Sequence, residues 1–371
     1  MKKLLFIFLL PLFMASVKAQ PLYTLQHGGL TRIYLKYIPS SYTGAQAYPL
    51  VICLHGLGDT IENFKNIGMQ FVGDTADFIT VYPEAVASPF GTAWNSGASY
   101  LGYVLNGTID DVGFLSALID TMSVHYNINP QRVYVCGFSM GGFMSQRLAC
   151  QLGNKVTAIA SVAGTFGNNL TCAPMRKIPV CHFHGTADTQ VAYINNSYGN
   201  DPEELVDWWV NFNECDTPAV HTALPDLVAD GITVDKYYYA NPTYHADVLF
   251  YKATGANHQW LYPPANDIFY TFEIWNFFNP ITNLAYGIET PESSDLNVYP
   301  NPASTEVNIV LGNGWNSNVD VSVYSIDGQL LMQEKVQSTT VSLNTQKLSS
   351  GLYLIKISDS KRSSMRKIVI E

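Results

Sequence analysis

Six short apolar runs recur between residues 20 and 282 and alternate with stretches of helical periodicity. The runs are 50–54, 78–81, 133–136, 158–162, 180–183 and 247–251. Most are apolar at nearly every position and contain β-branched residues, which is typical of strands in a parallel sheet covered by helices on both faces. The helix-like stretches between them include 111–126, 141–152, 203–212 and 268–278. This part of the chain therefore predicts an α/β fold.

The composition changes near residue 283. Residues 283–295 contain Gly287, Pro291 and two serines, a mixture that is typical of a linker. Six short alternating runs follow, with Asp327-Gly328 between two of them as a hairpin signal; they are 306–310, 320–325, 330–336, 340–343, 352–357 and 366–370. Residues 296–371 therefore predict a small all-β, immunoglobulin-like sandwich, separate from a domain at 20–282.

The first residues have the pattern of a secretory signal peptide. Lys2-Lys3 precede an apolar run over 4–14, and Val17-Lys18-Ala19 supplies small residues before a cleavage point. We expect residues 1–19 to be removed. No later apolar run is long enough to cross a membrane, so the mature chain should have no membrane span.

The charge balance excludes nucleic acid as the main partner. The chain has 20 Lys and Arg against 30 Asp and Glu, a net charge of −10. Proteins that bind a phosphate backbone carry a basic footprint instead. The acidic balance mainly supports solubility.

The six cysteines would meet an oxidising compartment after export. Cys53, Cys136 and Cys181 lie in apolar runs and should be buried thiols. The other three, at 150, 172 and 215, lie outside the predicted strands. A Cys172–Cys215 bridge is one interpretation, although sequence does not determine connectivity.

The most specific motif is Gly137-Phe138-Ser139-Met140-Gly141, between a predicted strand and a predicted helix. This context is that of a nucleophile elbow, a tight turn that lifts a serine hydroxyl clear of a sheet. Small residues must stand two positions to each side of the serine. The helix start that follows supports negative charge near the hydroxyl.

A serine needs a base to take its proton, and in this kind of sheet the acid and then the base follow the serine along the chain. Asp188 follows the run at 180–183, and His258 follows the run at 247–251. Both fall at the carboxyl edge of the sheet, where ligands bind. We predict a triad in which Asp188 orients His258 and His258 deprotonates Ser139.

Several other acids and histidines are weaker alternatives. His182 and His184 sit in or at the end of a strand, which favours a buried supporting role. His221, His245, Asp216, Asp235 and Glu273 lack the strand-end setting of the predicted pair.

The loop Leu54-His55-Gly56-Leu57-Gly58 follows the first run and is suited to an oxyanion hole. The expected donors are the backbone N–H groups of Leu57 and Met140, with His55 holding the loop. No ligand cluster or phosphate-binding glycine loop is evident, so we predict neither a metal nor another cofactor.

Residues 25–280 resemble the secreted feruloyl esterase and polyhydroxybutyrate depolymerase-like branch of the α/β-hydrolases. The resemblance rests on LHGLGD (54–59), VYPEA (81–85), AWNSG (93–97), DDVGFL (110–115), RVYVCGFSMGG (132–142), VAG (162–164), HGTAD (184–188) and HQW (258–260). It implies a catalytic α/β-hydrolase domain over 20–282 with the triad on Ser139, Asp188 and His258. Thr189 and Ala256-Asn257 depart from the family pattern without removing a catalytic group.

The same stretches suggest where a substrate would bind. Trp94, Phe138 and Trp260 are expected near the rim, where they would hold a flat acyl group; packing at the rim is the alternative for both tryptophans. Either Asp110 or Asp111 is expected to cap the following helix.

The C-terminal region resembles the type A sorting domain of the type IX secretion system. Val298-Tyr299-Pro300-Asn301-Pro302-Ala303, Leu348–Tyr353 and Lys367–Ile370 carry the resemblance. It implies export through the periplasm and outer membrane by the type IX machinery, to the cell surface or medium. A carbohydrate-binding module is less favoured, because Trp315 is the only tryptophan there.

Together these features predict a secreted serine esterase that acts on feruloyl or acetyl decorations of plant polysaccharide. One alternative is a polyester depolymerase or general lipase. An alternative of another class is a catalytically inactive surface-binding protein, which the intact triad disfavours.

Overall fold

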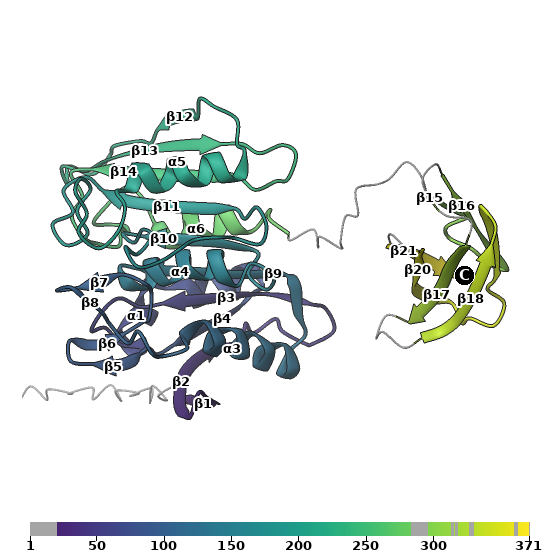
Figure 1. The fold of residues 1–371 in the computed structure, drawn as a ribbon. Helices are drawn as coiled ribbons and strands as arrows, with labels where there is room; N and C mark the ends of the chain where they lie inside the picture. The colour runs from purple at the N-terminus through teal and green to yellow at the C-terminus, as the bar shows by residue number, and fades with distance from the viewer. Residues whose placement is uncertain are drawn as a thin grey trace, which may run out of the picture. The chain divides into compact units, whose positions relative to one another are not determined.

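The computed structural model describes residues 21–282, 296–312, 315, 318–325, 330–359 and 363–370. The chain divides into two compact units, Met1–Asn283 and Leu284–Glu371 (Figure 1). The predicted signal peptide at 1–19, the linker at 283–295 and the Asp327-Gly328 turn lie outside the described residues.

A ten-stranded sheet forms the centre of the first unit. Its strands are β1 (Tyr23–His27), β2 (Leu30–Tyr37), β3 (Tyr48–Leu54), β4 (Ile79–Pro83), β9 (Ile128–Phe138), β10 (Ala158–Val162), β11 (Val180–Gly185), β12 (Val220–Ala223), β13 (Thr233–Tyr239) and β14 (Val248–Thr254). They lie in the order β1-β2-β4-β3-β9-β10-β11-β14-β13-β12. Six neighbouring strands of this order pair in parallel, namely β4, β3, β9, β10, β11 and β14. They correspond to the six predicted runs.

Both faces of the parallel strands are buried, as the continuous apolar runs predict. Alternate residues of β3 enter different apolar cores: Leu50 and Ile52 belong to one, and Val51 and Cys53 to the other. Because successive side chains of a strand point to opposite faces, two apolar faces require two covering layers.

Helices form the two layers. They are α1 (Ile61–Phe64), α2 (Met69–Ala76), α3 (Asp111–His125), α4 (Met140–Gln151), α5 (Pro202–Asn213) and α6 (Tyr270–Phe278), with a 3₁₀ turn at Lys65–Ile67. Apolar residues of α3, α4 and α5 share one core with the sheet, and those of α1, α2 and α6 share the other. No helix in the described part of the chain has both the length and the apolar character needed to span a membrane.

The edges of the sheet were not predicted. Strands β1 and β2 on one side, and β13 and β12 on the other, pair antiparallel. All four residues of β12 are exposed, so its sequence lacks the apolar signal of the central runs. Two small hairpins after β4 were also missed: β5 (Val86–Ser88) with β6 (Gly91–Ala93), and β7 (Ser99–Tyr100) with β8 (Tyr103–Val104).

The second unit is all-β, as predicted. One sheet contains β15 (Leu296–Tyr299), β16 (Glu306–Leu311) and β19 (Thr340–Asn344); the other contains β17 (Asn318–Ser325), β18 (Leu330–Gln337), β20 (Gly351–Ser358) and β21 (Ser363–Ile370). Buried side chains from both sheets form one apolar core, among them Val307, Val341, Val321 and Ile355. The immunoglobulin-like arrangement of these strands stays a prediction.

The disulfide differs from the one proposed from sequence. Cys150, in the last turn of α4, bonds to Cys172, with their Cα atoms 5.0 Å apart. Cys215 is a free thiol whose Sγ lies 3.6 Å from the carbonyl oxygen of Ala246. The Cys172–Cys215 bridge is therefore wrong, because the fold brings the loop at 172 to the end of α4.

Candidate active site

Ser139 lies at the sharp turn between β9 and α4. Its backbone has φ 53° and ψ −119°, a sparsely populated conformation that costs roughly 1–3 kcal/mol in a residue with a side chain. The Ser139 N–H donates to the carbonyl of Val162 at 2.8 Å. A Cβ on Gly137 would lie 2.2 Å from the Gly141 carbonyl oxygen, and one on Gly141 would lie 2.0 Å from that of Leu54. Crowding therefore requires both glycines of the elbow.

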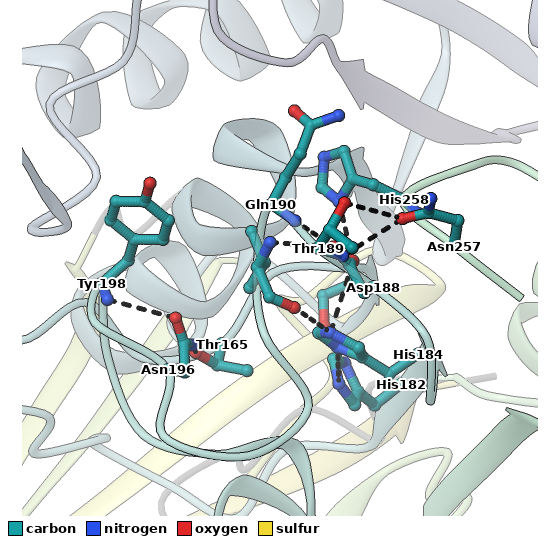
Figure 2. Close-up of polar contacts among 12 residues, drawn as sticks. Thr165, His182, His184, Asp188, Thr189, Gln190, Asn196, Tyr198, Asn257 and His258 are labelled. Carbon is teal, nitrogen blue, oxygen red and sulfur yellow. Dashed lines mark hydrogen bonds and ion pairs between the residues drawn. The ribbon is translucent and has the colours of Figure 1, made fainter.

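Asp188 and His258 meet at the ends of the neighbouring strands β11 and β14. His258 Nδ1 lies 2.7 Å from Asp188 Oδ2. Asp188 Oδ1 accepts hydrogen bonds of 2.8 Å from the backbone N–H groups of Gln190 and Val191 (Figure 2). Burial alone would raise the pKa of Asp188, but the hydrogen bond from His258 and the two amides outweigh burial and lower it.

This geometry determines the tautomer of the imidazole. An ionised carboxylate only accepts hydrogen bonds, so Nδ1 of His258 carries the proton that faces Asp188. The other nitrogen, Nε2, is then free to accept a proton. His258 and Ser139 line the same cavity. The structure thus brings the three predicted triad residues to one edge of the sheet.

The loop after β3 passes next to the nucleophile turn. A Cβ placed on Gly56 would lie 3.3 Å from Cβ of Ser139, and both Leu57 and Met140 line the cavity. Neither of their backbone N–H groups has a hydrogen-bond partner within the described residues. Met140 is also the first residue of α4, where N–H groups lack partners inside the helix. Two such donors beside a serine are suited to stabilise an oxyanion.

Trp94, predicted to contact substrate, instead supports this loop from behind. Its side chain is fully buried and does not line the cavity, and its Nε1 donates to the His55 carbonyl at 2.9 Å. His55 Nε2 accepts from the Ala85 N–H at 3.0 Å, so the ring proton is on Nδ1, 2.8 Å from the Gly56 carbonyl oxygen. Burial lowers the pKa of His55. His55 therefore holds the loop, as expected, and the prediction for Trp94 is wrong because its ring packs inward.

The cavity has a volume of about 330 Å³, at the small end of the range for ligand sites. Phe138 lines it, as predicted. Trp260 does not: it packs on Phe138 with ring centroids 6.4 Å apart and donates its indole N–H to Thr271. Trp260 therefore has the rim-packing role that was its alternative.

Two aromatic residues of the cavity were missed from the sequence, Tyr100 and Tyr198. Tyr100 ends β7, and Tyr198 lies in the loop between Asp188 and α5. Both tyrosines follow segments that end at the edge of the sheet where Ser139 lies. Their place in the sequence after such segments could have indicated that they line the cavity.

His182 and His184 form a buried chain of hydrogen bonds that ends beside the triad. His184 Nε2 lies 2.8 Å from the Val191 carbonyl oxygen, which only accepts, so this nitrogen carries the proton. The neutral ring then accepts at Nδ1 from His182 Nε2, 3.2 Å away. His182 Nδ1 in turn accepts from the Ser161 hydroxyl at 2.7 Å. We call Ser161, His182, His184 and Val191 the histidine chain (Figure 2).

Both histidines of the chain stay neutral near pH 7. Burial lowers the pKa of His184 to about 4, although the Val191 carbonyl and Asp188 act in the opposite direction. Burial and the neighbouring His184 lower the pKa of His182 well below its usual value. His184 Nε2 also lies 3.5 Å from Asp188 Oδ2. The expected supporting role of both histidines agrees with these contacts.

The other residues weighed as catalytic alternatives lie outside the cavity. His221 pairs with Asp235 at 2.7 Å across β12 and β13. Glu273 accepts a hydrogen bond from the Tyr251 hydroxyl at 2.6 Å. None of these groups faces Ser139 through the cavity.

The two aspartates of the family signature have structural contacts. Asp110 is the N-cap of α3 and accepts from the Gly113 N–H at 2.9 Å. Asp111 is buried, pairs with Arg32 at 2.8 Å and accepts from the Asn95 N–H. The predicted capping role is confirmed for Asp110.

Asp226, Asp230 and Asp267 are the acidic group of the described residues whose ligand atoms come close enough to hold a metal ion, within 4.8 Å of one another. Asp267 already accepts from the N–H groups of Leu227 and Val228. The group is partly exposed and lies outside the cavity of Ser139. The expectation of no metal cofactor stays a prediction.

Known proteins match the two units separately. Residues 42–199, which contain Ser139 and Asp188, match the phospholipase/carboxylesterase family. Residues 297–371 match the secretion system C-terminal sorting domain.

Several curated relatives are similar to the first unit. Feruloyl esterase B of Piromyces equi is 31% identical over 169 residues, 44% of this chain and 30% of that protein. A bifunctional acetylxylan esterase/xylanase of Neocallimastix patriciarum is 34% identical over 42% of this chain and 21% of that protein. This chain thus spans less than a third of the length of either relative.

A third relative is matched over most of its length. The acyl-protein thioesterase 1 homolog 2 of Dictyostelium discoideum is 32% identical over 160 residues, 38% of this chain and 70% of that protein. A solved structure, the acetyl xylan esterase from Aspergillus awamori, aligns with 70% of this chain and 99% of its own, at 13% identity and a TM-score of 0.49. Because the thioesterase homolog is 32% identical and is matched over 70% of its length, the chain belongs to the phospholipase/carboxylesterase family of α/β-hydrolases, and it carries a C-terminal secretion sorting domain.

Proposed function

We propose that this protein is an exported serine carboxylic-ester hydrolase that acts on ester decorations of plant polysaccharide. One observation carries the proposal. Ser139, on a strained elbow, shares a cavity with His258, whose Nδ1 is held 2.7 Å from the buried carboxylate of Asp188. An activated serine beside unpaired N–H groups is equipped for acyl transfer.

Acylation would proceed in two stages. Ser139 Oγ attacks the ester carbonyl carbon while its proton passes to His258 Nε2, and the carbonyl oxygen becomes an oxyanion held by the N–H groups of Leu57 and Met140. The intermediate then breaks its bond to the alcohol oxygen, which receives the proton from His258. The alcohol leaves, and the acyl group stays bonded to Ser139.

Deacylation repeats these stages with water. Water gives a proton to His258 Nε2 and attacks the acyl carbon, and the same N–H groups hold the second oxyanion. Cleavage of the bond to Ser139 Oγ releases the acid and returns the proton to the serine. Asp188 keeps its negative charge throughout and stabilises the imidazolium form of His258.

Two observations support an ester-decorated polysaccharide as substrate. Relatives of the first unit are named feruloyl esterase and acetylxylan esterase. The cavity of about 330 Å³ is suited to one compact acyl group, which disfavours a long-chain lipase. Feruloyl and acetyl esters are the two candidate acyl groups.

The test compares wild type with Ser139→Ala on methyl ferulate, acetylated xylan, a C16 acyl ester and polyhydroxybutyrate film. We expect turnover of the first two and a loss of at least ~10³-fold in the variant. Ser123→Ala, on the exposed side of α3, is the matched control and should act as wild type. Fastest turnover of the C16 ester or the film would favour a lipase or a depolymerase. No turnover of any ester would favour the inactive binding protein.

We further propose that the two units are independent domains and that the second directs export by the type IX machinery to the cell surface or medium. Its match to a secretion sorting domain supports this role. The first unit has its own two apolar cores and the second a third, which supports separate folding.

A further inference from the structure

One side of the catalytic cavity is formed by two tyrosines from separate loops. The rings of Tyr100 and Tyr198 are nearly parallel, at 22°, with centroids 6.1 Å apart. This separation is too small to admit a third ring between them, so the pair presents one continuous aromatic surface. We call Tyr100 and Tyr198 the tyrosine pair. Phe90 packs edge-on against Tyr100, with ring centroids 5.1 Å apart.

The loops that carry the tyrosine pair are tied together by Asn168. Its Oδ1 accepts from the Ser99 N–H at 3.0 Å, next to Tyr100. Its backbone N–H donates to the carbonyl of Tyr198 at 2.9 Å, and its Nδ2 donates to the carbonyl of Ser197 at 3.2 Å. These bonds fix the backbone at both tyrosines before any ligand arrives, so little backbone ordering entropy is lost on binding.

The hydroxyl groups of the tyrosine pair are available for hydrogen bonds. Within the described residues, neither the Tyr100 hydroxyl nor the Tyr198 hydroxyl has a hydrogen-bond partner. Asn196 Oδ1 accepts a hydrogen bond of 3.1 Å from the backbone N–H of Tyr198. Figure 2 shows the Tyr198 ring turned away from Asn196. Both tyrosines line the cavity, and a tyrosine hydroxyl without a partner can bind a ligand.

Part of the cavity wall next to the pair is apolar. Ala98, Phe143 and Val191 form a small buried cluster on which Tyr198 packs, and all of them line the cavity. An acetyl group would leave most of this surface in contact with water. A flat ring with hydroxyl or methoxy groups would cover it and would pair with the two free hydroxyls.

We propose that Tyr100 and Tyr198 determine acyl specificity by binding the substituted phenyl ring of a hydroxycinnamoyl ester. This inference rests on the proposed esterase function of Ser139 and selects between the two acyl groups left open there. The tyrosine faces stack on the ring, and their hydroxyls bind its oxygen substituents.

The test uses three methyl esters with one leaving group: methyl ferulate, methyl cinnamate, whose ring is unsubstituted, and methyl acetate. Tyr100→Ala and Tyr198→Ala should each lower kcat/KM for both aromatic esters roughly two- to tenfold, and leave methyl acetate unchanged. Tyr100→Phe and Tyr198→Phe should lower kcat/KM for methyl ferulate by a similar factor and spare methyl cinnamate. Tyr103→Ala is the matched control, because Tyr103 lies in the same hairpin, is 72% exposed and does not line the cavity.

Two results would overturn the role of the tyrosine pair. One is an unchanged ratio of ferulate to acetate turnover in the alanine variants. The other is a wild-type enzyme that hydrolyses methyl acetate but neither aromatic ester. In both cases Ser139→Ala would still abolish acetate hydrolysis, so the proposed function would stand. Turnover that survives Ser139→Ala would refute the proposed function itself.

Discussion

Mild acid should destabilise the catalytic unit through the histidine chain. In an unfolded chain a histidine takes up a proton as the pH falls below about 6.5. In the folded protein burial of the ring lowers the pKa of His184 to about 4, although the hydrogen bond to the Val191 carbonyl acts in the opposite direction. Between these values the unfolded state binds more protons than the folded state, so stability falls as the pH falls. The stabilising contribution of neutral His184 is complete above pH 6.5 and is lost by about pH 4.

The magnitude follows from the two pKa values. A pH of 5 is about 1.5 units below the usual histidine pKa, so His184 is mostly protonated in the unfolded chain. In the folded protein it is still mostly neutral at this pH. At ~1.4 kcal/mol per pH unit, His184 alone lowers the free energy of unfolding by about 2 kcal/mol between pH 7.5 and 5. His182 acts in the same direction, since its pKa is also lowered.

The assay is urea unfolding followed by tryptophan fluorescence at pH 7.5 and 5, because five of the six tryptophans lie in the first unit. The variant is His184→Gln, whose amide retains a donor for the Val191 carbonyl but does not titrate. Wild type should lose about 2 kcal/mol more than this variant between the two pH values. His125→Gln, at an exposed site at the end of α3, should behave as wild type. Equal losses in wild type and His184→Gln would refute the reasoning.

Four further outcomes are expected. Asp188→Asn should lower kcat/KM by ~10³–10⁴-fold through loss of the imidazole orientation, whereas Asp216→Asn, at an exposed site, should have no effect; the reverse order would mean that the acid is misassigned. Gly141→Ala should lower the free energy of unfolding by about 3 kcal/mol or more, since its Cβ would lie 2.0 Å from the Leu54 carbonyl oxygen; a stable, active variant would contradict the crowding at the elbow. Dialysis against EDTA should leave ester hydrolysis unchanged, and activity restored by zinc after such treatment would reveal a metal cofactor. Removal of residues 284–371 should preserve turnover of methyl esters by the soluble first unit and abolish its export; insoluble protein would show that the first unit needs the second.

Local patterns were sufficient to predict the parallel sheet and the meeting of Ser139, Asp188 and His258 at one of its edges. Short continuous apolar runs with β-branched residues are typical of strands buried on both faces, and β3 divides its side chains between two cores. The elbow is equally local, because the glycines beside Ser139 are required by contacts within one turn and one neighbouring strand. Asp188 and His258 could be placed because parallel strands bring their carboxyl ends to the same edge.

The edge strands and the disulfide could not be predicted in the same way. An edge strand such as β12 is exposed at every residue, so it has no apolar signal. The pairing of Cys150 with Cys172 depends on where a loop crosses the end of α4. The edge strands and the disulfide both depend on contacts between separate segments. The number of residues between two segments does not tell how close they lie in the fold.

For this protein the sequence by itself determined the parallel sheet and predicted which strand ends and which loop would meet around Ser139, because each follows from short-range periodicity or from strand direction. Only the tertiary structure decided which aromatic rings meet the cavity. Trp94 and Tyr100 both follow β4 within a few residues of each other, yet Trp94 packs inward under the His55 carbonyl and Tyr100 faces the cavity beside Tyr198. The reason is physical: Trp94 lies in a loop and Tyr100 in a strand of two residues, so neither belongs to a periodic pattern long enough to set the direction of its side chain, and the segments packed around each residue determine that direction.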